Sequence, residues 1–147
     1  MTEHAALARK LFFEGYNCSQ AVFCAFCDVT GLDIDAAARM SSSFGAGLGR
    51  LREVCGAVSG VALVLGIVRG YSDPADYEAK KAHYALIQEF ARRFAEANGS
   101  IVCHALLGGV AAGGAPEVRT ETFYQKRPCP NLVASAAALL DEMLKEG

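Results

Sequence analysis

The chain has 147 residues, of which 52% are hydrophobic, and its 14 Lys and Arg residues nearly balance 16 Asp and Glu residues. This length and composition predict one domain, residues 1–147, with a large apolar core and little disorder. Because the formal charge is −2 and there is no basic run, nucleic-acid binding is not expected.

The N-terminal residues 1–10 carry mixed charge and lack the apolar block and cleavage site of a signal peptide. We therefore expect a cytoplasmic protein, in which thiols are normally reduced. The longest apolar stretch, residues 54–68, is shorter than a bilayer span and is flanked by charged residues, so membrane insertion is not expected. The six cysteines are expected to have redox, metal-binding or catalytic roles rather than to form three structural disulfides.

The first two predicted helices lie in residues 2–31. Apolar residues at helical spacing predict a helix over residues 2–14, and Gly15 supplies its stop. Asn17 is a favourable N-cap for a second helix, residues 18–31, which is apolar on nearly all sides. Such a helix is expected to lie at the centre of the fold.

The next two predicted helices flank a glycine-rich loop. Asp33 or Asp35 is expected to cap a third, alanine-rich helix that ends before the loop of residues 45–49. A fourth helix is predicted over residues 51–69. Its many small residues lower helix propensity, a loss that the close approach of another helix or of a cofactor could offset.

The second half of the chain begins with a long charged helix. Asp73 and Pro74 predict its start, and Asn98-Gly99 predicts its end. Ser100 then resembles the N-cap of a short helix that carries Cys103 and His104.

Residues 108–127 are expected to be irregular, a length of loop that is usually functional or mobile. Pro130 predicts the start of a C-terminal helix that runs through Met143. Because no run of residues is typical of a strand, the sequence predicts an all-α fold, a compact bundle of about six or seven helices. The apolar surplus could also face a second subunit in an intertwined dimer.

Four cysteines each fall where a helix is expected to begin, and we call them the site cysteines: Cys18, Cys55, Cys103 and Cys129. The positive end of a helix favours a thiolate and lowers the pKa of a thiol. Basic residues next to Cys55 (Arg50 and Arg52) and next to Cys129 (Lys126 and Arg127) add positive charge. The wide spacing of the four matches no local zinc or ferredoxin pattern, so a shared site would have to be assembled by tertiary packing. Spacing alone leaves open the alternative that these thiols only fill the core.

The remaining candidates carry weaker indications. Cys24 and Cys27 form a Cys-x-x-Cys pair, but they interleave with phenylalanines on an apolar helix, so core packing is the favoured interpretation. His104, next to Cys103, could be a proton donor, a base or a further ligand, although a lone histidine of this kind is more often a partly exposed polar residue.

The segment of residues 45–70, with Cys55-Gly56-Ala57-Val58-Ser59-Gly60 at its centre, resembles the C_GCAxxG_C_C family of redox-active proteins. In that family one cysteine precedes a Cys-Gly-Ala-x-x-Gly motif and two follow it, which corresponds to Cys18 before Cys55, and to Cys103 and Cys129 after it. The context of residues 15–21 and the Cys129-Pro130 pair are also similar. The resemblance covers nearly the whole chain.

The family includes a domain related to one in split-Soret cytochrome c, a dimeric multihaem protein with an iron–sulfur cluster. The resemblance therefore implies a helical homodimer in which the four site cysteines, with Gly56 beside Cys55, hold a cluster. No Cys-x-x-Cys-His is present, so the haem part does not carry over.

Our leading hypothesis is an electron-transfer protein with an iron–sulfur cluster, [2Fe–2S], and an unidentified redox partner protein. One alternative is a metal-free thiol–disulfide oxidoreductase that uses the same four cysteines in two pairs. Another is a structural or carrier protein with zinc or Cu(I) held by four thiolates.

Overall fold

The computed structural model describes residues 1–147 and is all-α, which confirms the predicted fold class. The helices of eight or more residues, in line with the six or seven expected, are α1 (Glu3–Phe13), α2 (Cys18–Ala25), α4 (Ile34–Ser41), α6 (Gly56–Arg69), α7 (Tyr77–Asn98) and α10 (Cys129–Lys145). The shorter segments are α3 (Cys27–Thr30), the 3-10 helix η1 (Ser42–Phe44), α5 (Gly45–Leu48), α8 (Cys103–Leu106) and α9 (Glu121–Lys126). None of the helices combines the length and the apolar character needed to span a membrane. The expected dimer stays a prediction, because the structure is of one chain.

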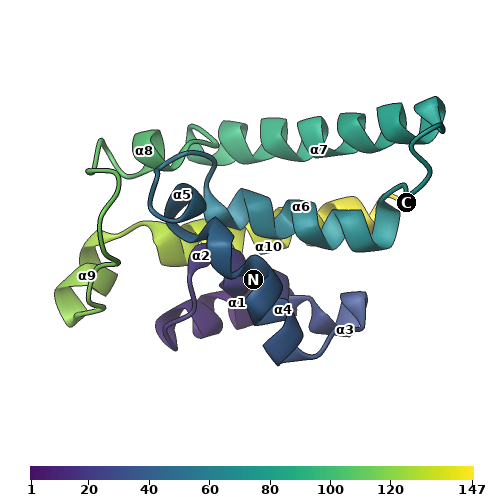
Figure 1. Ribbon diagram of the computed structural model, residues 1–147. Coiled ribbons are helices and arrows are strands. Elements are labelled where there is room, and N and C mark those ends of the chain that lie inside the picture. The colour runs from purple at the N-terminus through teal and green to yellow at the C-terminus, as the bar shows by residue number, and fades with distance from the viewer.

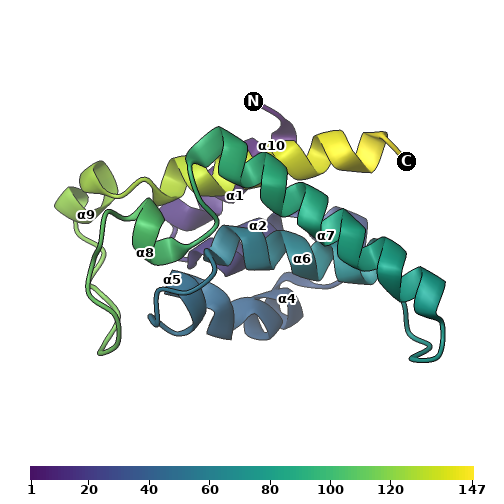
Figure 2. The same ribbon diagram turned by 90° about the horizontal axis from the view of Figure 1, so that it is seen from above.

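Helix α2 lies at the centre, as its apolar sequence predicts, and packs against α1, α4, α6 and α10. Figure 1 shows α7 along one side of the molecule, α6 and α10 in the middle, and α1 with α4 on the other side. Seen from above, α7 runs obliquely across α10 and α6 (Figure 2), and it contributes only Phe90 and Phe94 to the buried interior. Leu86 and Ile87 of α7 also pack against this core as partly buried residues.

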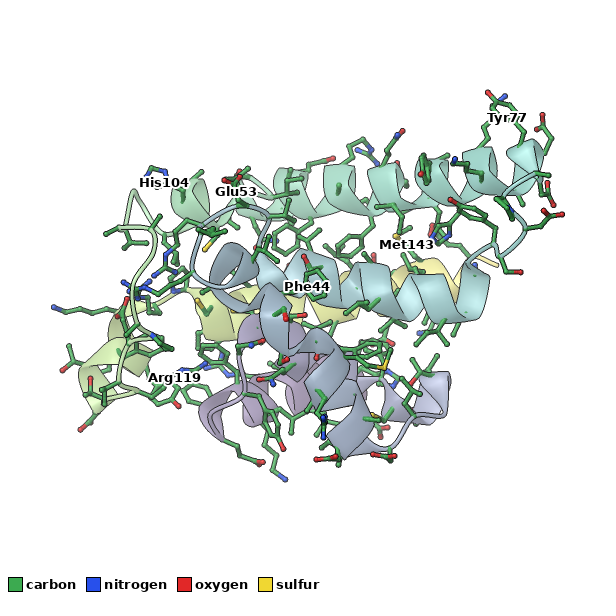
Figure 3. The ribbon with its side chains drawn as sticks, viewed as in Figure 1. Phe44, Glu53, Tyr77, His104, Arg119 and Met143 are labelled. Carbon is green, nitrogen blue, oxygen red and sulfur yellow. The ribbon has the colours of Figure 1, made fainter.

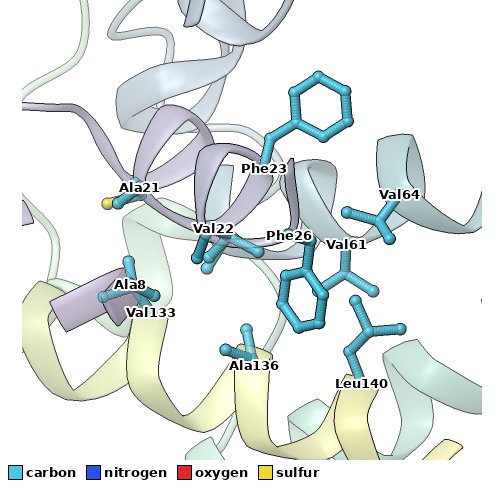
Figure 4. Close-up of a cluster of buried hydrophobic side chains, with 14 of the residues drawn as sticks. Ala8, Ala21, Val22, Phe23, Phe26, Val61, Val64, Val133, Ala136 and Leu140 are labelled. Carbon is cyan, nitrogen blue, oxygen red and sulfur yellow. The ribbon is translucent and has the colours of Figure 1, made fainter. Parts of the chain in front are cut away.

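One apolar core joins the central helices. Figure 4 shows Phe26 close to Val61 of α6 and Leu140 of α10, with Val22 of α2 beside them. All four side chains have no exposed surface. Complete burial of a side chain of this size contributes about 1.5–3 kcal/mol, so this contact region is a main source of stability.

Local capping accounts for most helix boundaries. The side chains of Thr2, Asn17 and Asp33 each accept a hydrogen bond from a backbone N–H in the first turn of α1, α2 and α4. Helix α7 ends at Asn98, followed by Gly99 with φ of 102°, a left-handed conformation that glycine adopts without strain. The predicted cap at Asn17, the cap at Asp33 and the end of the long helix are confirmed.

Two predicted helices are shorter than expected. The helix predicted over residues 18–31 is interrupted at Phe26 (φ −104°, ψ 20°), where α2 gives way to α3. The fourth helix begins at Gly56 rather than at residue 51. The residues before it pair instead with a distant segment, through an isolated antiparallel bridge between Val54 and Val102.

Three further boundaries differ from the sequence prediction. Helix α7 begins at Tyr77 and is capped by Asp76, because Asp73 accepts a hydrogen bond in a separate turn before the helix. The Ser100 hydroxyl accepts from the Val102 N–H and does not cap α8, which begins at Cys103. The segment expected to be irregular contains α9, capped by Thr120. Of the two predicted caps, the one at Asp73 is thus replaced by Asp76, whereas α8 begins at Cys103 without a side-chain cap.

His4 of α1 contacts residues of α3 and α10. Its ring stacks on Phe26 with centroids 4.1 Å apart, Nδ1 lies 2.8 Å from Asp141 Oδ1 of α10, and Nε2 lies 2.9 Å from Asp28 Oδ1 of α3. Although burial acts in the opposite direction, hydrogen bonds to Asp28 and Asp141 raise the pKa of His4 above 6.5. The imidazolium is therefore held more firmly in the folded protein than in the unfolded chain.

We expect this contact to stabilise the fold fully below pH 6.5 and to lose its contribution as pH rises through the raised pKa of His4. The free energy of unfolding, measured by urea denaturation at closely spaced pH values, should fall over that window. In a His4→Gln variant the fall should be reduced. An unchanged pH profile in the variant would show that His4 does not cause it.

Candidate functional site

The four site cysteines come together at one cavity. Cys18, Cys103 and Cys129 are the first residues of α2, α8 and α10, and Cys55 is the N-cap of α6. The predicted starts of α2 and α10 are confirmed, whereas α6 and α8 begin later in the chain than the sequence predicted. All four are buried and all four line a cavity of about 270 Å³. Figure 1 shows the starts of α6, α8 and α10 gathered at the same end of the molecule as α5 and α9.

Cys55 and Cys103 are held beside each other by the backbone. The Cys55 N–H donates to the Ile101 carbonyl at 2.7 Å, and the Cys103 N–H donates to the Glu53 carbonyl at 2.6 Å. These two bonds flank the Val54–Val102 bridge and fix two segments that are far apart in sequence. Gly56, which the family resemblance placed at the site, also lines the cavity. A Cβ added to Gly56 would lie 3.1 Å from Cys18 Cβ. Its lack of a side chain therefore lets α6 begin against α2.

A strained turn precedes Cys55. Four non-glycine residues have left-handed backbone conformations, with φ between 54° and 72°: Ala46, Leu48, Arg50 and Arg52. Each costs about 1–2 kcal/mol relative to an ordinary conformation. Hydrogen bonds to distant backbone offset this cost: the Gly113 N–H donates to the Arg50 carbonyl at 2.8 Å, and the His104 N–H to the Arg52 carbonyl at 3.1 Å. Backbone strain maintained in this way is typical of functional sites.

Cys18 is positioned by the cap of α2. The Asn17 side chain accepts from the Gln20 N–H and donates to the Ser42 carbonyl, which ties the start of α2 to η1. Gly45 permits this contact, because an added Cβ there would lie 2.3 Å from Asn17 Cγ. Gly45, which has an ordinary extended backbone, is therefore required for packing rather than for its conformation.

Positive side chains surround the thiols. The cavity lining includes one carboxylate, Glu117, and four arginines, namely Arg50, Arg52, Arg119 and Arg127. One oxygen of Glu117, Oε1, is shared by three of these arginines: Arg50 Nη1 at 3.2 Å, Arg52 Nη2 at 3.6 Å, and Arg127 at closer range. A single carboxylate offsets only part of this charge, so the cavity favours negative charge within it.

Burial acts against the expected helix-end effect on the thiols. Burial raises the pKa of Cys55 to about 12, although the N–H groups of Ala57 and Val58 act in the opposite direction. The Cys129 thiol, followed by burial, raises the pKa of Cys18 well above its ordinary value. The expectation of a lowered pKa is therefore wrong for Cys18 and Cys55.

Cys129 is the exception among these three. The Cys18 thiol, acting as a donor, lowers the pKa of Cys129, and Arg127 and Arg119 act in the same direction against the effect of burial. In the metal-free protein Cys129 thus has more thiolate character than Cys55. The sequence favours Cys55 as the thiolate, because Arg52 is close to it in the chain. Arg52 instead contacts Cys103, with Nη1 3.7 Å from Sγ.

The other candidate residues lie outside the cavity lining. His104 is exposed on α8 (Figure 3), and Lys126 is exposed at the end of α9. Cys24 is buried in the core and its Sγ donates to the Ile34 carbonyl at 3.8 Å, while Cys27 is partly exposed. The structure thus brings the four site cysteines together and leaves Cys24 and Cys27 apart from them.

Two charged cavity residues were not found from the sequence: Arg119 and Glu117. Arg119 donates to the Phe12 carbonyl at 2.8 Å and to the Tyr16 carbonyl at 2.9 Å, and its guanidinium lies over the Phe12 ring, 4.1 Å from the centroid. It thereby attaches the segment before α9 to the turn between α1 and α2, a position that Figure 3 also shows. Because its partners lie more than 100 positions away, no local pattern indicates this role.

The donors of the cavity fit a cluster in their chemistry. Thiolates are the usual ligands of iron–sulfur clusters, and nearby positive charge compensates the negative charge of such a group. No three His, Cys, Asp or Glu side chains are grouped closely enough to hold one metal ion. A cluster divides its thiolates among several irons, whereas a tetrathiolate zinc site would require all four sulfurs to meet at one ion.

Comparison with protein families gives one match. Residues 16–143 match the family model described as "Putative redox-active protein (C_GCAxxG_C_C)". No curated protein and no solved structure matches the chain. The matched range contains all four site cysteines and every arginine of the cavity.

Proposed function

This chain belongs to the C_GCAxxG_C_C family, described as redox-active, and on that premise we propose that its four site cysteines hold an iron–sulfur cluster, [2Fe–2S], for electron transfer. The observation that carries the proposal is the convergence of four buried thiols, from four helix starts, on one cavity lined by arginines. When bound, such a cluster accepts one electron from a donor protein and passes it to an acceptor protein. A homodimer and a cytoplasmic location remain part of the proposal.

The chain's own residues would have three tasks at this site. The site cysteines supply the ligand sulfurs, and burial keeps water away from them. The four thiolates bring negative charge into a buried cavity, and the raised pKa values of Cys18 and Cys55 indicate that this charge is costly there. The arginines of the cavity compensate it. The backbone hydrogen bonds from Cys55 to Ile101 and from Cys103 to Glu53 keep two of the ligands in place as the charge changes.

The test is strictly anaerobic purification, followed by iron, acid-labile sulfide and zinc analysis on the sample used for the visible spectrum. Comparable amounts of iron and sulfide with thiolate-to-iron absorption bands are the expected result. Zinc without sulfide would instead indicate a tetrathiolate zinc site. A colourless, metal-free protein would overturn the proposal.

One observation favours a second candidate, thiol–disulfide exchange: the neighbouring Cys18 donor lowers the pKa of Cys129. In this reaction the Cys129 thiolate attacks a partner protein's disulfide and releases one partner thiolate. Cys18, after losing its proton, attacks the Cys129 sulfur and releases the second. The partner gains two electrons, the protein keeps a Cys18–Cys129 disulfide, and thiol titration of metal-free protein should fall by pairs on oxidation.

A further inference from the structure

Arg52 is the only buried charged residue of the protein, with 6% of its surface exposed. Burying a guanidinium is costly unless its N–H groups find partners. Its backbone is also left-handed, with φ of 61°, a further cost for a residue with a side chain. The contacts of the Arg52 side chain must therefore offset both the burial of its charge and its left-handed backbone.

The partners of the Arg52 guanidinium lie on three segments around the cavity. Nε donates to the Ala111 carbonyl at 3.1 Å, Nη2 lies 3.6 Å from Glu117 Oε1, and Nη1 donates to Cys103 Sγ at 3.7 Å. The first two contacts hold the plane of the guanidinium, and the third directs one N–H at a site sulfur. No other charged side chain forms a hydrogen bond to a cysteine sulfur in this structure.

Arg50 provides a close comparison within the same turn. It is also left-handed, with φ of 72°, and it too pairs with Glu117. Its Nε donates to the Gly113 carbonyl at 2.7 Å, where Arg52 uses the neighbouring Ala111. The two arginines therefore share a strained backbone, a carboxylate partner and contact with the same segment, and they differ in that Arg52 reaches a sulfur.

We propose that Arg52 is a positioning residue that orients the Cys103 sulfur and raises the reduction potential of the site by stabilising negative charge on that sulfur. This inference rests on the proposed function. One-electron reduction adds one negative charge, supplied by the donor, to the thiolate-bound group. A hydrogen bond from a cation to a ligand sulfur favours the reduced state, since such bonds and the net charge set the potential of iron–sulfur centres.

The experiment compares Arg52→Met with Arg50→Met in anaerobically purified protein, using sodium dithionite as the reductant in a potentiometric titration. We expect the midpoint potential of Arg52→Met to be more negative than that of the unchanged protein, with iron and sulfide retained, and the shift in Arg50→Met to be smaller. Arg52→Lys keeps the charge and should restore part of the potential. Equal shifts in the two Met variants, or no shift in loaded Arg52→Met, would overturn the proposal.

A second readout keeps the two proposals separable. If the unchanged protein holds no iron or sulfide, the cluster proposal fails, and the contact is tested by mass-spectrometric measurement of iodoacetamide alkylation at Cys103. Arg52→Met should then change the alkylation rate at Cys103 more than Arg50→Met does, because only Arg52 donates to that sulfur. Equal rates would refute a role of Arg52 toward that sulfur. Should Arg52→Met fail to fold by circular dichroism, Arg52→Lys and Arg52→Gln take its place in both measurements.

Discussion

Replacing Cys55 with serine is expected to abolish cluster binding, while replacing Cys24 with alanine is expected to leave it intact. Cys55 is 4% exposed and lines the cavity at the start of α6, where serine would preserve size but offer iron a poor ligand. Cys24 is equally buried, but it lies in the core with its thiol directed at the Ile34 carbonyl. The comparison therefore separates ligation from burial.

Iron and sulfide per chain should fall to background in the serine variant of each site cysteine. They should stay at the level of the unchanged protein in Cys24→Ala and Cys27→Ala, with a loss of stability of about 1 kcal/mol for the buried Cys24. Metal analysis of all six variants, each checked for folding by circular dichroism, provides the measurement. Equal cluster loss in all six would contradict the assignment of these four cysteines as ligands.

Two glycine-to-alanine changes in α6 are expected to have opposite effects on stability. A Cβ at Gly60 would lie 2.9 Å from the Ser19 carbonyl oxygen and 3.0 Å from Val22 Cβ, so α2 would have to move away. Overpacking of this kind costs about 1–3 kcal/mol. At Gly66, which is exposed and in the same helix, nothing lies within 4 Å of the added Cβ. Alanine there should stabilise the protein by about 0.5–1 kcal/mol through helix propensity.

Urea denaturation of both variants, with the midpoint and the slope determined separately, measures these changes in the free energy of unfolding. Gly60→Ala should also lower cluster content, because Ser19 adjoins Cys18 at the start of α2. Changes of the same sign in the two variants would show that propensity, rather than the α2–α6 contact, decides stability here.

The sequence alone determined the helical fold and many helix ends. Asn17 caps α2, Gly99 follows the last residue of α7, and Pro130 lies in the first turn of α10. These are interactions within one or two turns, so neighbouring residues are sufficient to specify them. For the same reason the helix starts at Cys18 and Cys129 could be predicted, whereas those near Cys55 and Cys103 differ from the local prediction because their two segments pair with each other.

Only the tertiary structure decided where those helix starts meet. The bridge between Val54 and Val102 brings Cys55 beside Cys103 and displaces the expected start of α6. Arg52 donates to Cys103 rather than to Cys55, which is closer to it in sequence. The pKa values of the thiols also depended on tertiary packing. Burial outweighed the helix-end effect at Cys55, and Cys18, over 100 positions away in the chain, lowered the pKa of Cys129. Burial and charge contacts depend on residues brought together by packing, whereas caps and helical periodicity depend on residues adjacent in the chain.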